Sequence, residues 1–168
     1  MRAYLDIETT YSGTISVLGI YRHDYGSIQL VGGGICDLAL YDALSGITTI
    51  VTFNGSSFDL PVIRRRLHVD LLAEFAHRDL LRDCRRRGLR GGLKVVEETL
   101  GIARASTGLS GRDAPQLWER YEQYGDQAAL QILLDYNRDD IVNLALLEAI
   151  LDADHPLPAN PARLVKLQ

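Results

Sequence analysis

The chain has 168 residues, of which 46% are hydrophobic and 24% charged, a balance typical of one well-cored globular domain rather than of a disordered chain. Its formal net charge of -4 gives no general attraction for a polyanion. No apolar run approaches the roughly 18 residues that a membrane span requires. The N-terminus lacks the basic flank and apolar core of a signal peptide, so we expect a cytoplasmic protein without a membrane partner.

The first third of the chain is predicted to form strands and one helix. Three short strand-like runs at 2–7, 14–21 and 27–33 are separated by turns, and such short connections predict antiparallel neighbours. A helix expected at 36–44 then leads into 46–53, a continuous apolar, β-branched run typical of a strand buried on both faces. This helix is therefore a crossover between strands.

The rest of the chain is predicted to be mainly helical. We expect helices at 58–67, 79–88, 92–101, 114–124 and about 126–151. Asp113 as a cap and Pro115 in the first turn mark the start of one of them. A proline-rich stretch ends the last helix, so we expect a domain over 1–155 and an extended C-terminal tail over 156–168. This order of elements predicts an α/β or α+β layered domain with a mixed sheet.

Two acids interrupt the first predicted strand. Strand side chains alternate between faces, so Asp6 and Glu8 would share one face. Leu5 and Ile7 would point into the other layer. Ionised carboxylates held side by side repel each other, and burying them is costly unless a cation joins them. A metal ion is the simplest such cation.

A third acid follows the buried strand, and a tyrosine and a fourth acid fall in the last helix. Asp59 stands at the head of a helix after a turn begun by Asn54, either as a helix cap or in a loop of the kind that builds sites in open α/β sheets. Tyr136 and Asp140 are four residues apart, which puts both on one helix face, although Tyr136 alone could be a core-edge aromatic. Asp139 points elsewhere, and we expect it to be solvated or a local cap.

These positions supply four carboxylates and one hydroxyl without His or Cys: Asp6, Glu8, Asp59, Asp140 and Tyr136. Hard oxygen ligands suit Mg²⁺ or Mn²⁺. Two such ions about 4 Å apart can activate a water and stabilise the leaving oxygen in phosphodiester cleavage. Cys36 and Cys84 are too few and too isolated for a disulfide framework or a zinc site, and we assign them no chemistry.

The cations of this acidic chain are unevenly distributed. The stretch 78–94 holds seven Lys and Arg residues against two Asp, and 64–66 adds three arginines. One interpretation is a solvated basic face. The other is a surface that contacts phosphates.

Three motifs carry a resemblance to a known family. "LDIETT" at 5–10, "FNGSSFD" at 53–59 and "YNRDD" at 136–140 resemble the exonuclease motifs of the DEDD superfamily in its tyrosine-bearing version (DEDDy). The stretch 77–102 and "YNRDDIVNLALL" further resemble the YprB-type ribonuclease H-like domain. The resemblance implies an α/β ribonuclease H-like fold, whose mixed five-stranded sheet has three antiparallel strands followed by parallel ones and is flanked by helices.

By this resemblance the chain would be a 3′–5′ exonuclease that hydrolyses phosphodiester bonds at a single-stranded 3′ end of DNA or RNA. Two divalent ions, Mg²⁺ or Mn²⁺, would be bound by Asp6, Glu8, Asp59 and Asp140. Tyr136 would orient or deprotonate the attacking water.

The resemblance also implies residues that bind the substrate. Thr9 would lie near the terminal sugar, and Asn54 would shape the second motif's side of the cleft. The candidates for holding phosphates are Arg82, Arg85, Arg86, Arg87, Arg90 and Lys94.

Two other classes of protein are alternatives. Aspartyl-phosphate phosphatases also have an acidic pair on a first strand, but their first motif has Asp where this chain has Glu8, and their late acids follow a strand rather than lying in a helix as Asp140 does. An inert nucleic-acid-binding module would keep the fold, although unneeded clustered acids would destabilise it. Metal-dependent release of nucleotides would distinguish these classes.

Overall fold

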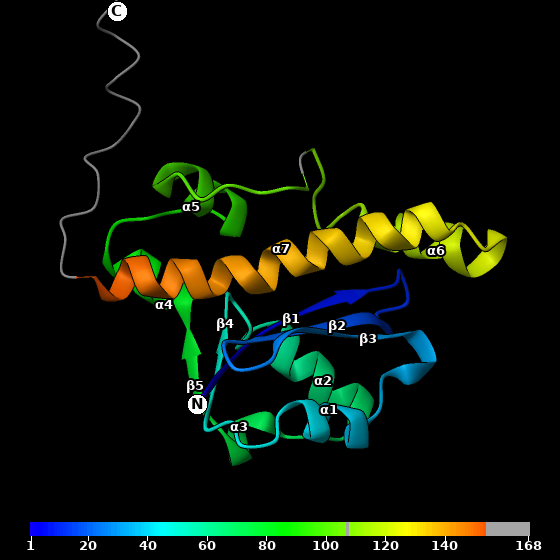
Figure 1. Ribbon diagram of the computed structural model, residues 1–168, viewed down its shortest axis with the longest axis horizontal. Coiled ribbons are helices and arrows are strands. Elements are labelled where there is room, and N and C mark those ends of the chain that lie inside the picture. Colours follow the sequence, from blue (N-terminus) through cyan, green and yellow to red (C-terminus); the bar gives the residue numbers. More distant parts are fainter. Residues whose placement is uncertain (107, 154–168) are drawn as a thin grey trace, which may run out of the picture.

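The computed structural model describes residues 1–106 and 108–153, which form a five-stranded sheet between two layers of helices (Figure 1). The expected tail at 156–168 lies outside the described residues. The sheet has the order β3-β2-β1-β4-β5. Its strands are β1 (Arg2–Thr9), β2 (Ile15–Arg22), β3 (Gly26–Val31), β4 (Thr49–Thr52) and β5 (Ala76–Asp79).

The pairing of the strands follows the length of their connections. β1 pairs with β2, and β2 with β3, in antiparallel fashion across short turns. β4 pairs with β1, and β5 with β4, in parallel fashion after helical crossovers. The expected mixed sheet of three antiparallel strands followed by parallel ones is confirmed.

The helices cover both faces of the sheet. They are α1 (Asp37–Ala43), α2 (Asp59–Leu67), α3 (Leu71–Glu74), α4 (Leu80–Arg86), α5 (Leu93–Leu100), α6 (Ala114–Tyr124) and α7 (Gln127–Asp152), with a 3-10 turn, η1, at Gly32–Gly34. Figure 1 shows α7 across one face, with α4, α5 and α6 beside it, and α1, α2 and α3 on the other face. None of the described helices combines the length and apolarity that a membrane crossing requires.

The central strand β1 contributes side chains to both layers. Leu5 and Ile7 pack into the core formed with α1 and α2. Tyr4, on the opposite face, packs into the core formed with α4 and α7. Because side chains alternate along a strand, Asp6 and Glu8 share the face of Tyr4 and lie on the α7 side of the sheet.

The long helix α7 is fixed from its first turn to its last. Asp126 caps its start by accepting a hydrogen bond from the Ala129 amide at 3.0 Å. Its 26 residues correspond to a length of about 39 Å. The buried side chains of Leu133, Leu144 and Leu147 hold it against the sheet, so its polar residues between these anchors are positioned over β1.

Two details differ from the sequence analysis. The strand segments predicted from the sequence did not include β5, whose four residues pair with β4. Asp113 precedes α6 as expected, but its carboxylate does not cap the helix and instead accepts hydrogen bonds from the Ser110 amide and hydroxyl at 2.7 and 2.8 Å. The reason is conformational: the backbone of Asp113 is already helical, whereas a capping residue is normally extended.

Candidate metal centre and active site

The C-terminal half of β1 carries the first two acids of the site. Glu8 is buried and Asp6 is half-buried, both on the α7 side of the sheet. Because β4 pairs only with Arg2, Ala3 and Tyr4, the edge of β1 beyond Tyr4 is left open on that side.

Asp59 is hydrogen-bonded to the open edge of β1. The Ile7 amide donates a hydrogen bond to Asp59 Oδ1 at 3.1 Å, and this carboxylate is buried. Asp59 is the first residue of α2 and not its cap. The structure therefore attaches the head of α2 directly to the strand between Asp6 and Glu8.

The loop from β4 to α2 is shaped by tight local geometry. Asn54 adopts a left-handed backbone with φ 66, and a Cβ on Gly55 would lie 2.2 Å from Thr52 Oγ1, so glycine is required there. Asp79, at the end of β5, accepts hydrogen bonds at 2.7 Å from both the backbone N–H of Asn54 and the Ser56 hydroxyl. This role of Asp79 was not predicted from the sequence, since it depends on the pairing of β5 with β4.

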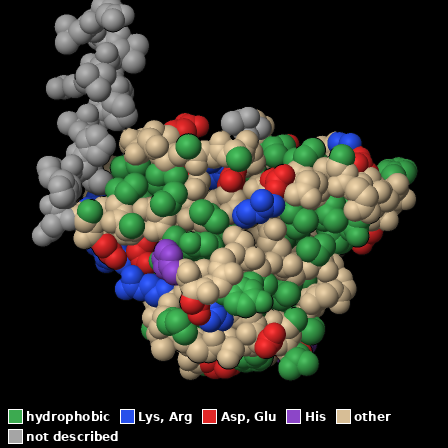
Figure 2. All heavy atoms as spheres, viewed as in Figure 1, with side chains coloured by type: hydrophobic (Ala, Val, Ile, Leu, Met, Phe, Trp, Pro, Cys, Tyr) green, Lys and Arg blue, Asp and Glu red, His purple; other side chains and the backbone are tan. Residues whose placement is uncertain are grey.

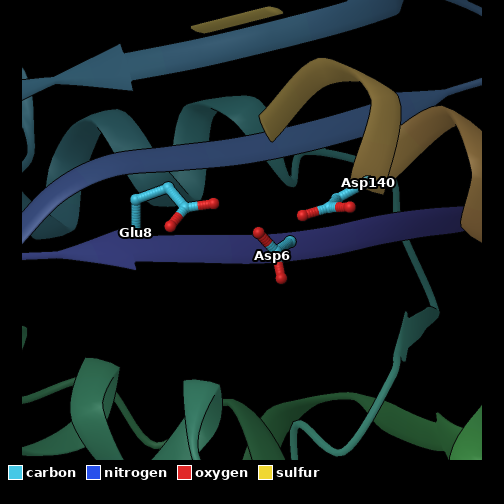
Figure 3. A group of neighbouring side chains, drawn as sticks. All are labelled: Asp6, Glu8 and Asp140. Atoms are coloured by element: carbon cyan, nitrogen blue, oxygen red, sulfur yellow. The ribbon is translucent and has the colours of Figure 1, made fainter. Parts of the chain in front are cut away.

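The last helix brings Asp140 to the acids of β1. Figure 3 shows the carboxylates of Asp6, Glu8 and Asp140 directed toward one another from β1 and α7. One oxygen from each of these three side chains lies within 4.8 Å of the others. Since Mg²⁺ holds oxygens at about 2.1 Å, small side-chain movements would close this group around one ion.

The hydrogen bonds of the acids leave oxygens available to a cation. The described residues provide one donor each to Asp6 (Asn137 Nδ2, 3.1 Å), Asp59 (Ile7 amide) and Asp140 (Arg104 Nη2, 2.6 Å). In each case the donor occupies one carboxylate oxygen, so the other is left for the site. A buried, all-oxygen donor set of this kind fits a hard divalent cation.

The electrostatics of the cluster also favour a cation. Burial raises the pKa of Asp59 to about 7 and that of Asp140 to about 6. Burial, followed by repulsion from Asp140 and Asp59, raises the pKa values of Asp6 and Glu8 well above their usual range. Among the described residues, Lys94 and Arg104 are the cations that lower the pKa values of Glu8 and Asp140, which leaves two cations beside four acids, and a bound metal ion would add the missing positive charge.

Tyr136 lies beside the acids, in a cavity of about 290 Å³. The cavity is lined by Asp6, Ile7, Glu8, Thr9, Phe53, Asn54, Phe58, Asp59, Gly111, Tyr136 and Asp140. The sequence-derived candidates for metal binding and catalysis, together with Thr9 and Asn54, therefore meet in one place. The Tyr136 ring is buried, with Lys94 Nζ 4.6 Å from its centroid, so Lys94 also belongs to this region.

Arg104 is a residue of the site that sequence reasoning missed. Its guanidinium bonds both Asp140 and Glu97, with Nη1 2.7 Å from Glu97 Oε2, and it lies 5.2 Å from the Tyr136 ring centroid. The fully buried Glu97 is held in turn by Asn143 Nδ2 at 3.0 Å. A lone arginine in a loop gives no sequence signal for this function.

Asp139 points away from the cavity, as its helix position predicted. Its Oδ2 accepts hydrogen bonds from the Ser106 amide and hydroxyl at 2.7 and 2.6 Å. Asp139 is half-buried in the middle of α7 and bonds a loop residue 33 positions away, so neither expected role, solvated or local cap, describes it, because the loop that holds Ser106 packs against the helix.

Most of the basic candidates lie outside the cavity lining. Arg86 is paired with Asp83, and Arg87 donates to the Leu151 carbonyl, which is about 16 Å along α7 from Asp140. Arg85 and Arg90 are exposed. Figure 2 shows acidic and basic side chains interspersed on the face it displays, without an extended patch of one sign.

Comparisons with known proteins agree with this architecture. The chain is 33% identical over 121 residues to the "Uncharacterized protein YprB" of Bacillus subtilis (strain 168), a match that covers 64% of this chain and 29% of YprB. Its fold is similar to that of the family B DNA polymerase from the hyperthermophilic archaeon Pyrobaculum calidifontis, with a TM-score of 0.66 at 19% identity, over 89% of this chain and 24% of the polymerase. The chain thus spans less than a third of either protein.

A family model covers nearly the whole described sheet and its helices. Residues 3–151 match the model described as the RNase_H superfamily. That range includes β1 from its second residue, the other four strands and each acid of the candidate metal centre. The chain belongs to the RNase_H superfamily.

Proposed function

We propose that this domain is a metal-dependent 3′–5′ exonuclease of the tyrosine-bearing DEDD type. The observation that carries the proposal is the convergence of Asp6, Glu8 and Asp140, whose oxygens lie within 4.8 Å of one another, with Asp59 and Tyr136 in the same cavity. Membership of the RNase_H superfamily supports nuclease chemistry at this cavity.

The proposed cofactors are two Mg²⁺ or Mn²⁺ ions. The residues that would hold them are Asp6, Glu8, Asp59 and Asp140, whose free oxygens face the cavity. When bound, such ions activate water and stabilise the oxygen that leaves in phosphodiester hydrolysis. The protein fixes the relative positions of the carboxylates, because α2 holds Asp59 and α7 holds Asp140 beside Asp6 and Glu8 of β1.

The side chains around the acids would bind and orient the reactants. Burial and the neighbouring acids raise the pKa of Tyr136 above its usual range, so its hydroxyl would stay protonated and would orient the attacking water beside the scissile phosphate. Thr9 and Asn54 line the cavity and would contact the terminal nucleotide. Lys94, next to Tyr136, would neutralise charge on the phosphate.

The size of the cavity supports a single-stranded end as the substrate. About 290 Å³ accommodates roughly one nucleotide, and the acids are buried or half-buried rather than presented on an open surface. A paired duplex presents its backbone on a wide cylinder and would not insert, whereas an unpaired 3′ end would. The proposed substrate is therefore a 3′-terminal single strand of DNA or RNA.

Matched 5′-labelled DNA and RNA strands test the proposal. With Mg²⁺ or Mn²⁺ present, we expect a ladder that shortens from the 3′ end and stops on addition of a chelator. Asp6→Ala is the matched control and should give no ladder. Products that shorten from the 5′ end, or degradation that persists in chelator, would contradict the proposal. Binding without any cleavage would favour the inert nucleic-acid-binding alternative.

A further inference from the structure

A hydrogen-bonded chain of side chains leads from the edge of the sheet to Asp6. Asn137 of α7 is fully buried, and its Nδ2 donates to Asp6 Oδ2 at 3.1 Å. Its Oδ1 accepts from Gln29 Nε2 of β3 at 3.0 Å. Asp6 is thus connected to a residue two strands away, one that contacts no acid of the site in the described part of the chain.

The direction of these hydrogen bonds is set by the backbone of α7. Gln29 Nε2 also donates to the Leu134 carbonyl at 2.8 Å, and a carbonyl can only accept. The amide nitrogen of Gln29 must therefore face α7, so Asn137 must turn its oxygen toward Gln29 and its nitrogen toward Asp6. The donor that Asp6 receives is in this way specified by a backbone group.

Gly19 provides the space for this arrangement. Asp6, Gly19 and Gln29 are in register across β1, β2 and β3, so they lie in one row on the α7 side of the sheet. A Cβ on Gly19 would stand 2.1 Å from Asn137 Oδ1, a distance that no real pair of atoms tolerates. Any larger residue at this position would displace Asn137.

We propose that Gln29 and Asn137 are positioning residues that hold Asp6 Oδ2 and thereby direct Asp6 Oδ1 to a divalent cation, in the space that Gly19 leaves open. The proposal rests on the proposed metal-dependent function. Groups that orient a metal ligand through hydrogen bonds commonly change metal affinity or activity by about 10- to 100-fold when they are removed. The alternative is that Asn137 merely satisfies buried polar groups, in which case its removal would lower stability alone.

Gln29→Glu is the discriminating variant, because it keeps the shape of the side chain and reverses its polarity. A carboxylate at this position accepts hydrogen bonds and cannot donate to Asn137, so the Asn137 amide should turn its oxygen toward Asp6. We expect the dissociation constant for Mn²⁺, measured by titration calorimetry on the metal-free full chain, to rise about 10-fold. Simple charge attraction predicts the opposite sign, since an added negative charge draws a cation closer.

Two controls separate the reversal of the hydrogen bonds from their simple removal and from the effect of charge. Gln29→Met removes the hydrogen bonds without reversing them and should weaken Mn²⁺ binding less than Gln29→Glu. Gln131→Glu makes the same chemical change on the exposed side of α7 and should leave Mn²⁺ binding unchanged.

A double-mutant cycle separates positioning from folding. Gly19→Ala should weaken Mn²⁺ binding and lower the melting temperature, because its methyl group displaces Asn137. Adding Asn137→Ala removes the clash, so the melting temperature should recover while Mn²⁺ affinity stays at the low value of Asn137→Ala alone. Recovery of both quantities would overturn the positioning role.

The outcomes distinguish this proposal from the proposed function. Equal Mn²⁺ affinities in the wild type, Gln29→Glu and Asn137→Ala would overturn the positioning role and leave the exonuclease proposal intact. Weakened Mn²⁺ binding in the variants of a protein that releases no nucleotides would support the positioning role and count against the exonuclease. A wild type that binds no Mn²⁺ would overturn both.

Discussion

Two groups of buried acids lie along the same face of β1, and they differ in the hydrogen bonds and ion pairs that they receive. Glu148 of α7, 2% exposed, receives a hydrogen bond from the Tyr4 hydroxyl at 2.8 Å and ion pairs from Arg2 and Arg78 at 3.0 and 2.9 Å. Glu8, 5% exposed, receives no hydrogen bond from the described residues. The acids around Glu8 share Arg104 and Lys94 as their nearby cations.

The difference shows how a structural acid can be separated from a candidate metal ligand. Burying an unpaired carboxylate costs several kcal/mol, so a fold that keeps one without a partner needs a cation from elsewhere. Around Glu148 the arginines supply the positive charge and the acid stabilises the fold. Around Glu8 the described residues supply two cations, Lys94 and Arg104, for four acids, which is the arrangement expected where a divalent ion adds positive charge.

Removal of a carboxylate from the acids around Glu8, which have few nearby cations, should produce the largest effect on activity. For Asp6→Ala we expect nucleotide release to fall by several orders of magnitude, because a shared metal ligand is removed. The metal-free protein should keep or gain stability, since repulsion with Glu8 and Asp140 is relieved. Initial rates and urea denaturation in chelator measure the two quantities. Full activity in this variant would remove Asp6 from the metal centre.

Tyr136 tests whether the cavity contains more than metal ligands. Tyr136→Phe keeps the ring that Lys94 and Arg104 contact and removes only the hydroxyl. If the hydroxyl positions the attacking water, kcat should fall by about 10²-fold with little change in KM. An unchanged kcat would return Tyr136 to a packing role.

Substitution of Glu148, the acid paired with arginines, should lower stability and leave activity unchanged, the reverse of what we expect for Asp6→Ala. For Glu148→Gln we expect the free energy of unfolding to fall by about 2 kcal/mol, because Arg78 and Arg2 lose a buried partner and both are partly solvated. Nucleotide release by the folded protein should be unchanged. If this variant instead lost activity at full stability, the proposed division between structural and metal-binding acids would be wrong.

The stability of the metal-free protein should also depend on pH through Asp59, one of the acids around Glu8. Burial raises the pKa of Asp59 to about 7 in the folded chain, above the unfolded value of about 3.9. The folded state therefore binds the proton more tightly, and the metal-free protein should become more stable as the pH falls from about 7 to 5, by at most about 1.4 kcal/mol per pH unit for this group.

Thermal melts in chelator over this range measure the effect. Asp59→Asn should flatten the slope, and saturating Mg²⁺ should flatten it as well, because the ion favours the deprotonated carboxylate. A slope that Asp59→Asn leaves unchanged would show that other groups govern it.

The sequence predicted those parts of the fold whose signal is local. The strands around Leu5, Leu18 and Leu30 and the helices at 114–124 and 126–151 have apolar periodicity of their own, and they were found within a few residues of the observed bounds. β5, with the sequence AHRD, has no β-branched run. It is a strand because Ala76 to Asp79 pair in parallel with β4, a contact that no short window of sequence reveals.

The same distinction applies to the site. Asp6 and Glu8, two residues apart, and Tyr136 and Asp140, four apart, are placed together by the geometry of a single element, so spacing indicated them. Arg104 reaches Asp140 from a loop, and Asn137 meets Gln29 across 108 residues of sequence. These contacts arise from tertiary packing, and a single buried amide or arginine has no pattern from which to predict them.

The smallest effect is expected in the basic segment from Arg82 to Lys94, whose two ends both approach the cavity. Arg82 Nη2 lies 3.3 Å from Ser56 Oγ in the loop before α2, and Lys94 lies against Tyr136. Between them, Arg86 and Arg87 are engaged with Asp83 and the Leu151 carbonyl, so their substitution would also alter stability. Arg85 and Arg90 are exposed and give the cleaner test.

If Arg85 and Arg90 hold phosphates of a single strand, removing each of these cations should reduce the slope of log affinity against log salt by about 0.7. The double variant Arg85→Gln, Arg90→Gln should therefore bind all sequences more weakly and with a flatter salt dependence, because phosphates carry no base information. Arg65→Gln removes one exposed cation from α2, across the sheet from α7, and as a control should change neither quantity (Figure 1). An unaltered slope in the double variant, with a normal circular dichroism spectrum, would make the segment a solvated face. Positive charge along the substrate's path would then come from cations nearer the cavity, among them Lys94, Arg104 and Arg82.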